Sequence, residues 1–259
     1  MATYLDRILV VHRQAAAADH RDVEQLIAEA AAGPAARPFA AALRDEDGLS
    51  VIAEVKRASP SKGALAMELD PAELAATYAS GGAACLSVLT DRQFFSGSPE
   101  DLVAARAAVS LPVLRKDFTV GPADVCDARL MGADAVLLIA AALSATELTD
   151  LVALAGRVGL AALVEVHDET ELEVALAAGA TLVGVNQRDL VTFQVDTARA
   201  ERVGKAIPDE VTSVAESGIR TADEAARLAD AGFDAILVGE SLVTSGDPAA
   251  AVAALRAES

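Results

Sequence analysis

The chain is 259 residues long, 53% hydrophobic and only 3% aromatic, and its formal net charge is −18 at pH 7. Such a negative charge disfavours nucleic acid and anionic membranes as partners, because long-range attraction follows the sign of the overall charge. Asp6, Arg7, His12 and Arg13 interrupt the apolar N-terminal stretch, which therefore predicts neither a signal peptide nor a membrane-spanning helix. These features together predict a soluble, cytoplasmic protein.

The first part of the chain, residues 1–50, has a helical pattern. Amphipathic stretches cover about 3–17 and 20–32, and a short helix is expected around 37–44. The segment is too short to be an independent domain. We expect it to cover one end of the remaining structure, or to lean over its mouth, so that residues 1–259 form one domain.

From residue 51 onward, short apolar runs alternate with Ala-rich stretches of helical length. Continuous apolar runs are typical of parallel strands that are covered on both faces. The runs are 51–55, 84–89, 112–116, 135–139, 160–166, 182–186, 211–216 and 235–239. Helix starts are marked by Asp70-Pro71, Ser98-Pro99, Gly121-Pro122, Ser144, Asp168, Thr197, Thr221 and Asp247-Pro248. Eight βα units over residues 51–259 predict an α/β fold, a (β/α)8 TIM barrel with an N-terminal helical extension. The alternative is an open doubly wound sheet.

Polar residues interrupt the apolar runs where the strands end, which is where barrel active sites lie. A single charged residue at such a place is usually a solvated loop residue. Several together, unpaired inside a barrel, would cost several kcal/mol. They therefore predict one converging site of Lys–Glu pairs. These residues are Glu54, Lys56, Lys116, Glu165, Asn186, Arg188 and Glu216.

The last two strands predict a phosphate site. Each is followed by a glycine beside a small hydroxyl residue, and such loops commonly bind phosphate in this fold. The residues concerned are Ser217, Gly218, Gly239, Glu240 and Ser241. The first βα loop, residues 57–70, is long for its class. It is either an ordinary surface loop or, as we prefer, a lid whose Lys62 or Ser59 closes on the ligand.

The sequence carries no signature of a metal or a cofactor. His12 and His20 are expected on the surface of the helical extension, and His167 is expected to be structural, although it follows Glu165 by two residues. Cys85 and Cys126 have no metal-ligand or redox spacing and are expected to be buried and unpaired. No glycine fingerprint for a dinucleotide follows the first strand, so no nicotinamide cofactor is expected.

Several motifs together resemble the indole-3-glycerol-phosphate synthase family. They are AEVKRASPSKG, LTDRQFFSGSPEDL, PVLRKDF, LVEVHDETEL, VGVNQRDL, AESGI and VGESL, in that order from about residue 50 onward. The resemblance implies the substrate 1-(2-carboxyphenylamino)-1-deoxyribulose 5-phosphate and the products indole-3-glycerol phosphate, CO₂ and water. It also implies a chain that acts as a monomer or a weak homodimer on this small phosphorylated substrate.

The resemblance also implies roles for individual residues. Lys116 occupies the position of the general acid that protonates the developing alkoxide, and Lys56, Glu54 and Glu165 match the second acid and the candidate bases. Substrate-binding positions are matched by Ser59, Phe95, Phe118, Asn186 and Arg188. Phosphate-binding positions are matched by Ser217, Gly218, Gly239, Glu240 and Ser241.

Two other functions remain open from sequence. One is a phosphosugar isomerase barrel similar to phosphoribosylanthranilate isomerase, which uses a Cys after strand 1 and an Asp near the end of strand 6. This chain has Glu54 and Lys56 at the first place and Asn186 at the second. The other is a non-catalytic barrel that binds a phosphorylated ligand. Such a protein would be expected to have lost Lys56, Lys116 or Glu165.

Overall fold

A computed structural model describes residues 3–44, 48–189 and 194–256 of the chain. Within these residues, parallel strands close into a barrel in the order β1-β10-β9-β8-β7-β6-β5-β4, and β4 pairs with β1 to complete the ring. The strands are β1 (Ser50–Val55), β4 (Cys85–Leu89), β5 (Val113–Lys116), β6 (Ala135–Ile139), β7 (Ala161–Val166), β8 (Leu182–Asn186), β9 (Thr212–Glu216) and β10 (Ala235–Val238). The predicted TIM barrel is confirmed, and each strand lies within a residue of its predicted bounds.

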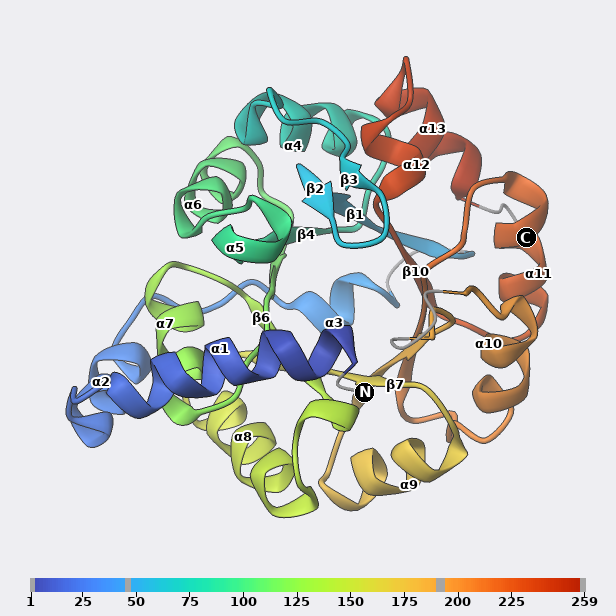
Figure 1. Cartoon of the computed structure of the whole chain (residues 1–259). Helices are drawn as coiled ribbons and strands as arrows, with labels where there is room; N and C mark the ends of the chain where they lie inside the picture. Colours follow the sequence, from blue (N-terminus) through green and yellow to red (C-terminus); the bar gives the residue numbers. More distant parts are fainter. Residues whose placement is uncertain (1–2, 45–47, 190–193, 257–259) are drawn as a thin grey trace.

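Helices surround the ring of strands on the outside (Figure 1). They are α4 (Pro71–Ser80), α6 (Pro99–Ala108), α7 (Pro122–Leu130), α8 (Ala145–Arg157), α9 (Glu169–Ala177), α10 (Thr197–Gly204), α11 (Ala222–Asp230) and α13 (Pro248–Leu255). The predicted start signals are N-caps or first-turn prolines in every case but one. Asp196, not Thr197, caps α10, because its side chain accepts the N–H of Ala198.

Five short elements were not predicted, and all lie in the loops between strands and helices. They are the hairpin β2 (Ala58–Ser59) and β3 (Gly63–Ala64), the helix α5 (Arg92–Phe95), the 3₁₀ turn η1 (Ala140–Ala142) and the helix α12 (Glu240–Val243). Each has two to four residues, too few to produce a periodic pattern in the sequence.

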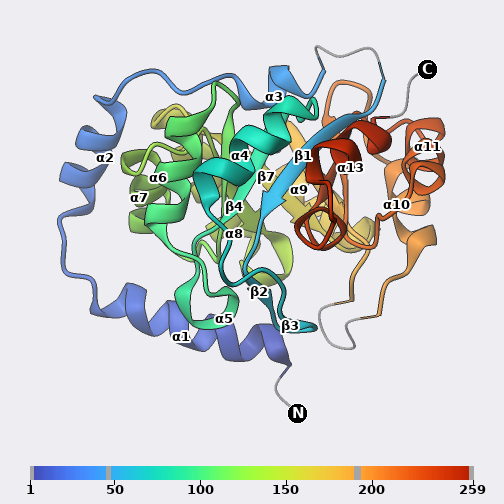
Figure 2. The same ribbon diagram turned by 90° about the horizontal axis from the view of Figure 1, so that it is seen from above.

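The N-terminal extension forms three helices that lie in different places. They are α1 (Tyr4–Ala18), α2 (Val23–Ala31) and α3 (Phe39–Ala42). In Figure 1, α1 crosses in front of the ring of strands, and Figure 2 shows α1 and α3 at opposite ends of the barrel. Helix α1 therefore leans over the mouth of the barrel, and α3 lies at the other end.

The core consists mainly of aliphatic side chains, with a few aromatic ones such as Phe39 and Tyr78. The strands β1, β4, β6 and β8 are buried along their whole length, in agreement with their apolar runs. Cys85 and Cys126 are buried and unpaired, as expected. Among the described helices, none combines the length and the hydropathy needed to cross a bilayer.

Candidate active site

A cavity opens at the carboxyl ends of the strands, under α1. It encloses about 1240 Å³ of empty space, including the part that is open to solvent. Every residue to which the family resemblance gives a role lines this cavity, whereas Lys62 of the predicted lid does not. The residues with such a role are Glu54, Lys56, Ser59, Phe95, Lys116, Phe118, Glu165, Asn186, Arg188, Ser217, Gly218, Gly239, Glu240 and Ser241. Residues that are separated by up to 187 positions therefore come together in one place.

Lys116, the last residue of β5, lies between two carboxylates. Its Nζ is 3.3 Å from Oε2 of Glu165, at the end of β7, and 3.2 Å from Oε2 of Glu216, at the end of β9. Only 3% and 2% of these two glutamate side chains are exposed, so their charges interact through little water. Room for Glu216 comes from Gly184 in β8, because a Cβ there would clash with Oε1 of Glu216.

Protonation within this group is unevenly distributed. Burial opposes the charge on Lys116, but Glu216, Glu165 and Glu54 more than offset it and raise the pKa of the ammonium. Burial, Glu165 and Glu54 raise the pKa of Glu216 to about 7, despite the opposing effect of Lys116. The pKa of Glu165 is lowered, because Lys116, His167 and Asn186 more than offset its burial. The group can therefore hold a proton on Glu216 near neutral pH while Lys116 stays charged.

A second lysine–glutamate pair lies at the end of β1. Glu54 and Lys56 are two residues apart and so project to the same side of the chain. Nζ of Lys56 is 2.5 Å from Oε1 of Glu54, and the hydroxyl of Ser87 lies 3.5 Å from Oε2 of the same carboxylate. Gly239 packs against this pair, because a Cβ at that position would overlap Glu54 and lie 2.9 Å from Nζ of Lys56. A glycine is therefore required here by close packing.

The loops after β9 and β10 form a concave backbone surface. Ser217 and Gly218 line the cavity and have φ angles of 71° and 79°, in the left-handed region of backbone conformation. Gly239 is the N-cap of α12, so the N–H groups of Glu240 and Ser241 belong to the first turn and have no partner within the helix. The two loops are joined by a hydrogen bond of 3.1 Å from Oγ of Ser241 to the carbonyl of Ile219.

The first βα loop approaches the same surface. Its hairpin β2–β3 contains Ser59, which lines the cavity, and Lys62 lies at its turn. Nζ of Lys62 is 3.3 Å from Oε1 of Glu240, and both side chains are partly exposed. The guanidinium of Arg57 donates to the carbonyls of Met67 and Leu69 at 2.8 and 2.7 Å, which fixes the base of the loop.

One wall of the cavity is apolar. The rings of Phe95 and Phe118 have centroids 6.1 Å apart, and Tyr4, Leu5 and Ile8 of α1 extend this wall across the mouth. Asn186 and Arg188 line the cavity at the end of β8, and Oδ1 of Asn186 accepts the backbone N–H of Arg188 at 3.0 Å.

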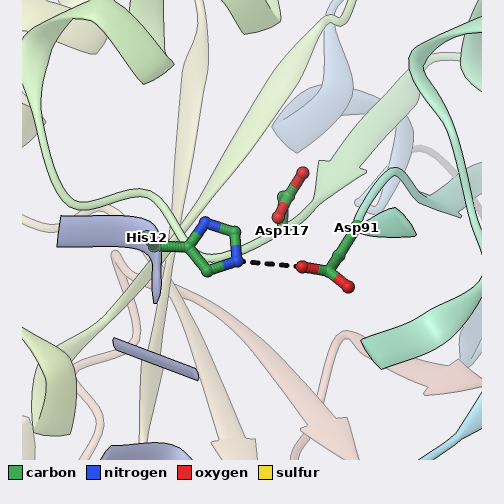
Figure 3. Close-up of side chains that lie close together, drawn as sticks. All are labelled: His12, Asp91 and Asp117. Atoms are coloured by element: carbon green, nitrogen blue, oxygen red, sulfur yellow. Dashed lines mark hydrogen bonds and ion pairs between the residues drawn. The ribbon is translucent and has the colours of Figure 1, made fainter. Parts of the chain in front are cut away.

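His12 is not a surface residue, so that expectation was wrong. Its Nε2 lies 2.9 Å from Oδ2 of Asp91 (Figure 3). Its ring also packs on Phe118, with centroids 5.4 Å apart. Helix α1 is thereby attached to the loop that follows β4. His12, Asp91 and Asp117 have ligand-type atoms within 4.8 Å of one another, a grouping that the sequence did not indicate.

Protein groups already use the carboxylates of this cluster. Oδ1 of Asp91 accepts the N–H of Phe94 at 2.5 Å. The carboxylate of Asp117 accepts hydrogen bonds from the hydroxyl of Thr90, from the guanidinium of Arg115 at 3.0 Å and from the backbone N–H of Phe118 at 2.8 Å. The cluster therefore acts as a hydrogen-bond network that connects α1 with the ends of β4 and β5.

The sequence missed some residues of the cavity. Glu216 was recognised as a strand-end residue, but it was not among the predicted catalytic residues, although its carboxylate forms an ion pair with Lys116. Arg220 and the α1 residues Tyr4, Leu5 and Ile8 also line the cavity. The signal for Glu216 was present, because it ends a buried strand in the same way as Glu165.

A closed parallel barrel that holds two lysine–glutamate groups beside a glycine-lined concave backbone belongs to the class of (β/α)8-barrel enzymes. The family model described as "Indole-3-glycerol phosphate synthase" matches residues 5–255. The chain therefore belongs to the indole-3-glycerol phosphate synthase family, as its motifs suggested. Neither the isomerase nor the non-catalytic alternative is supported.

Relatives agree with this family assignment, and two solved structures share the fold. The chain is 51% identical to a protein of Mycobacteroides abscessus named indole-3-glycerol phosphate synthase, over 98% of this chain and 93% of that protein. It is 52% identical to the protein of the same name from Rhodococcus jostii, over 98% and 94%. Solved structures of a thiamine phosphate pyrophosphorylase from Pyrococcus furiosus and a 3-hexulose-6-phosphate synthase share the fold. The first has a TM-score of 0.61 at 18% identity and covers 83% of this chain and 96% of its own. The second has a TM-score of 0.62 at 17% identity and covers 80% of this chain and 98% of its own.

Proposed function

We propose that the cavity closes the indole ring of 1-(2-carboxyphenylamino)-1-deoxyribulose 5-phosphate, releasing CO₂ and water and forming indole-3-glycerol phosphate. The observation that carries this proposal is the pairing of Lys116 with Glu165 and Glu216 in the same cavity as the Lys56–Glu54 pair, in a chain of this family. The reaction requires two proton donations and a base, and these groups can supply all three.

Lys116 is proposed as the first general acid. Attack of the ring carbon on the substrate ketone produces an alkoxide, which a buried ammonium can stabilise and then protonate. The two carboxylates at 3.2 and 3.3 Å keep Lys116 charged until that step. A Glu216 with a pKa of about 7 can return a proton to Lys116, because that value permits exchange at neutral pH.

Lys56 is proposed as the second acid, which protonates the hydroxyl group that leaves as water. Loss of CO₂ occurs before this step. The base that then takes a proton from the methylene carbon beside the ring nitrogen, as the C=C bond of the indole forms, is a carboxylate of the same cavity, Glu165 or Glu54. Paired Lys–Glu groups exchange protons as a unit, so their macroscopic pKa values belong to the group as a whole.

The remaining contacts would orient the substrate. The concave backbone at Ser217, Gly218 and residues 239–241 is proposed to bind the phosphate. Phe95 and Phe118 are proposed to contact the benzene ring from the apolar wall. Ser59, Asn186 and Arg188 are proposed to bind the carboxylate or the hydroxyls of the sugar chain.

We further propose a cytoplasmic protein with a single barrel domain over residues 1–259, which acts as a monomer or weak homodimer. The charge of −18 supports the proposal that it binds neither nucleic acid nor membranes.

The direct test is incubation of the purified chain with the proposed substrate while indole fluorescence and CO₂ release are recorded. We expect equal amounts of indole-3-glycerol phosphate and CO₂. Lys205→Ala is a suitable control variant, because Lys205 is exposed at the end of α10, and it should turn over like the wild type. Absence of product from folded protein would refute the proposal.

A further inference from the structure

The two carboxylates beside Lys116 are alike in position but differ in their surroundings. Both are almost completely buried, and both lie about equally far from Nζ, at 3.3 Å for Glu165 and 3.2 Å for Glu216. When one proton enters such a pair, the ammonium between them does not determine which carboxylate takes it. Other neighbours must make that difference.

Glu165 faces an imidazole on the side away from Lys116. Nε2 of His167 lies 3.7 Å from Oε1 of Glu165, two residues further along the chain and on the same side of it. This Nε2 is buried and has no hydrogen-bond partner among the described residues. Oε1 of Glu216 is also buried without such a partner there, and it packs against Gly184. Only Glu165, of the two, therefore has an imidazole as a close neighbour in the described structure.

Glu171 holds this imidazole in place. Oε2 of Glu171 accepts the backbone N–H of His167 at 2.8 Å and lies 3.0 Å from Nδ1 of its ring. Glu171 is fixed in turn as the third residue of α9, because its own N–H donates to the capping Asp168 at 2.8 Å. An ionised carboxylate can only accept, so Nδ1 carries a proton, and a second proton on the ring must be on Nε2, beside Glu165.

The charges around the ring favour that second proton. Burial opposes it, but the hydrogen bond to Glu171 and the charges of Glu165 and Glu171 raise the pKa of His167 despite the opposing charge of Arg199 on α10. These three are the charged groups that face His167 from β7, α9 and α10. The charge interaction between His167 and Glu165 also contributes to the lowered pKa of Glu165.

We propose that His167 is a positioning residue: as an imidazolium held between Glu171 and Glu165, it keeps Glu165 ionised and so makes Glu216 the carboxyl group that carries the exchangeable proton. The proton on Glu216 lies opposite Lys116, and Glu165 stays available as a base. The catalytic consequence depends on the proposed function, whereas the coupling between His167 and Glu165 does not.

The coupling can be measured without substrate. The chain has three histidines, so the side-chain nitrogen NMR signals of the full chain labelled with ¹⁵N-histidine can be assigned by comparison with His167→Asn. We expect the pKa of His167 to fall in Glu165→Gln by at least roughly 0.7 units, since two unit charges about 4 Å apart interact by that much even in bulk water. The control is Glu169→Gln. Glu169 is the first residue of α9 and pairs with the exposed Arg202, so this variant should leave the pKa of His167 unchanged. An identical His167 pKa in Glu165→Gln and wild type would overturn the proposal.

The pH profile of kcat/KM tests the catalytic consequence. His167→Asn removes the ring's charge, so the pKa of Glu165 should rise and the acid limb should move to higher pH by at least roughly 0.7 units. If His167 had a purely structural role, His167→Asn would lower the thermal midpoint and the active fraction but leave the acid limb at its wild-type pH. An unshifted acid limb would therefore also overturn the proposal. Wild-type protein that makes no indole product would refute the proposed function alone, because the NMR coupling is independent of turnover.

Discussion

Lys116→Met is the substitution that tests the site most severely. Methionine fills about the same space as the lysine chain but removes the ammonium that lies 3.2 and 3.3 Å from Glu216 and Glu165. Two buried carboxylates then face each other without a cation between them. We expect both a loss of turnover and a loss of stability that depends on pH.

The size of the stability effect follows from linkage. Removing one partner of a buried ion pair costs about 3–5 kcal/mol when the other partner stays charged. In the variant, burial and mutual repulsion raise the folded-state pKa of at least Glu216 beyond its wild-type value of about 7. A carboxyl group with a raised folded-state pKa stabilises the folded state less as pH rises, by about 1.4 kcal/mol per pH unit for each proton it retains. From pH 6 to pH 8, the unfolding free energy of the variant should therefore fall by about 2.7 kcal/mol per such carboxyl group. The wild type should lose about half as much, because its Glu216 titrates within that range.

The measurement is urea unfolding of wild type, Lys116→Met and Lys205→Met at pH 6, 7 and 8. Groups that titrate alike in all three proteins cancel from the differences. Turnover of Lys116→Met should fall by at least ~10²-fold, the usual contribution of a general acid. A destabilisation that is the same at all three pH values would refute the assigned charge state of Glu216. Turnover within a few-fold of wild type would remove Lys116 from the mechanism.

Two further variants test the other parts of the cavity. Ser217→Ala combined with Ser241→Ala should raise KM several-fold with kcat nearly unchanged, because phosphate contacts are nearly uniform along the reaction; a KM like that of wild type would place the anion elsewhere. Gly239→Ala should lower kcat, because the new Cβ displaces the Lys56 ion pair, whereas Gly156→Ala, which has no atom within 4 Å of the new Cβ, should keep wild-type kinetics in the same assay.

The barrel could be predicted from the sequence because most of its strands are buried on both faces. An apolar run such as 135–139 is then stable only as a strand between two parallel strands and covered by helices. Capping residues such as Ser144 and Thr221 marked the helix starts by satisfying N–H groups of the first turn. Both signals depend only on residues within or next to the element itself, so the rest of the fold does not alter them. The short helix α12 lacks them and was missed.

The position of α1 could not be predicted, because no local rule fixes where an amphipathic helix packs. Its contacts are made by single residues far apart in the chain. Arg13 donates to Glu147 at 2.8 Å and to the carbonyl of Ala142 at 2.9 Å, and His12 bonds to Asp91. From sequence alone, His12 is one polar residue on a helix with many exposed positions, which is why it was wrongly placed on the surface.

Charge at the cavity explains how so acidic a chain can be expected to hold a phosphorylated substrate. The chain has 21 Lys and Arg against 39 Asp and Glu, whereas the cavity lining is nearly balanced. Its cations are Lys56, Lys116, Arg188 and Arg220, and its acids are Glu54, Asp117, Glu165, Glu216 and Glu240. With the proton on Glu216, the two signs become equal in number. Because the field of the whole molecule repels anions, affinity for the substrate has to come from this local balance and from backbone N–H groups. We therefore expect the carboxyl group of Glu216, whose pKa is raised to about 7, to contribute both to binding, by removing a negative charge, and to catalysis, by storing a proton next to Lys116.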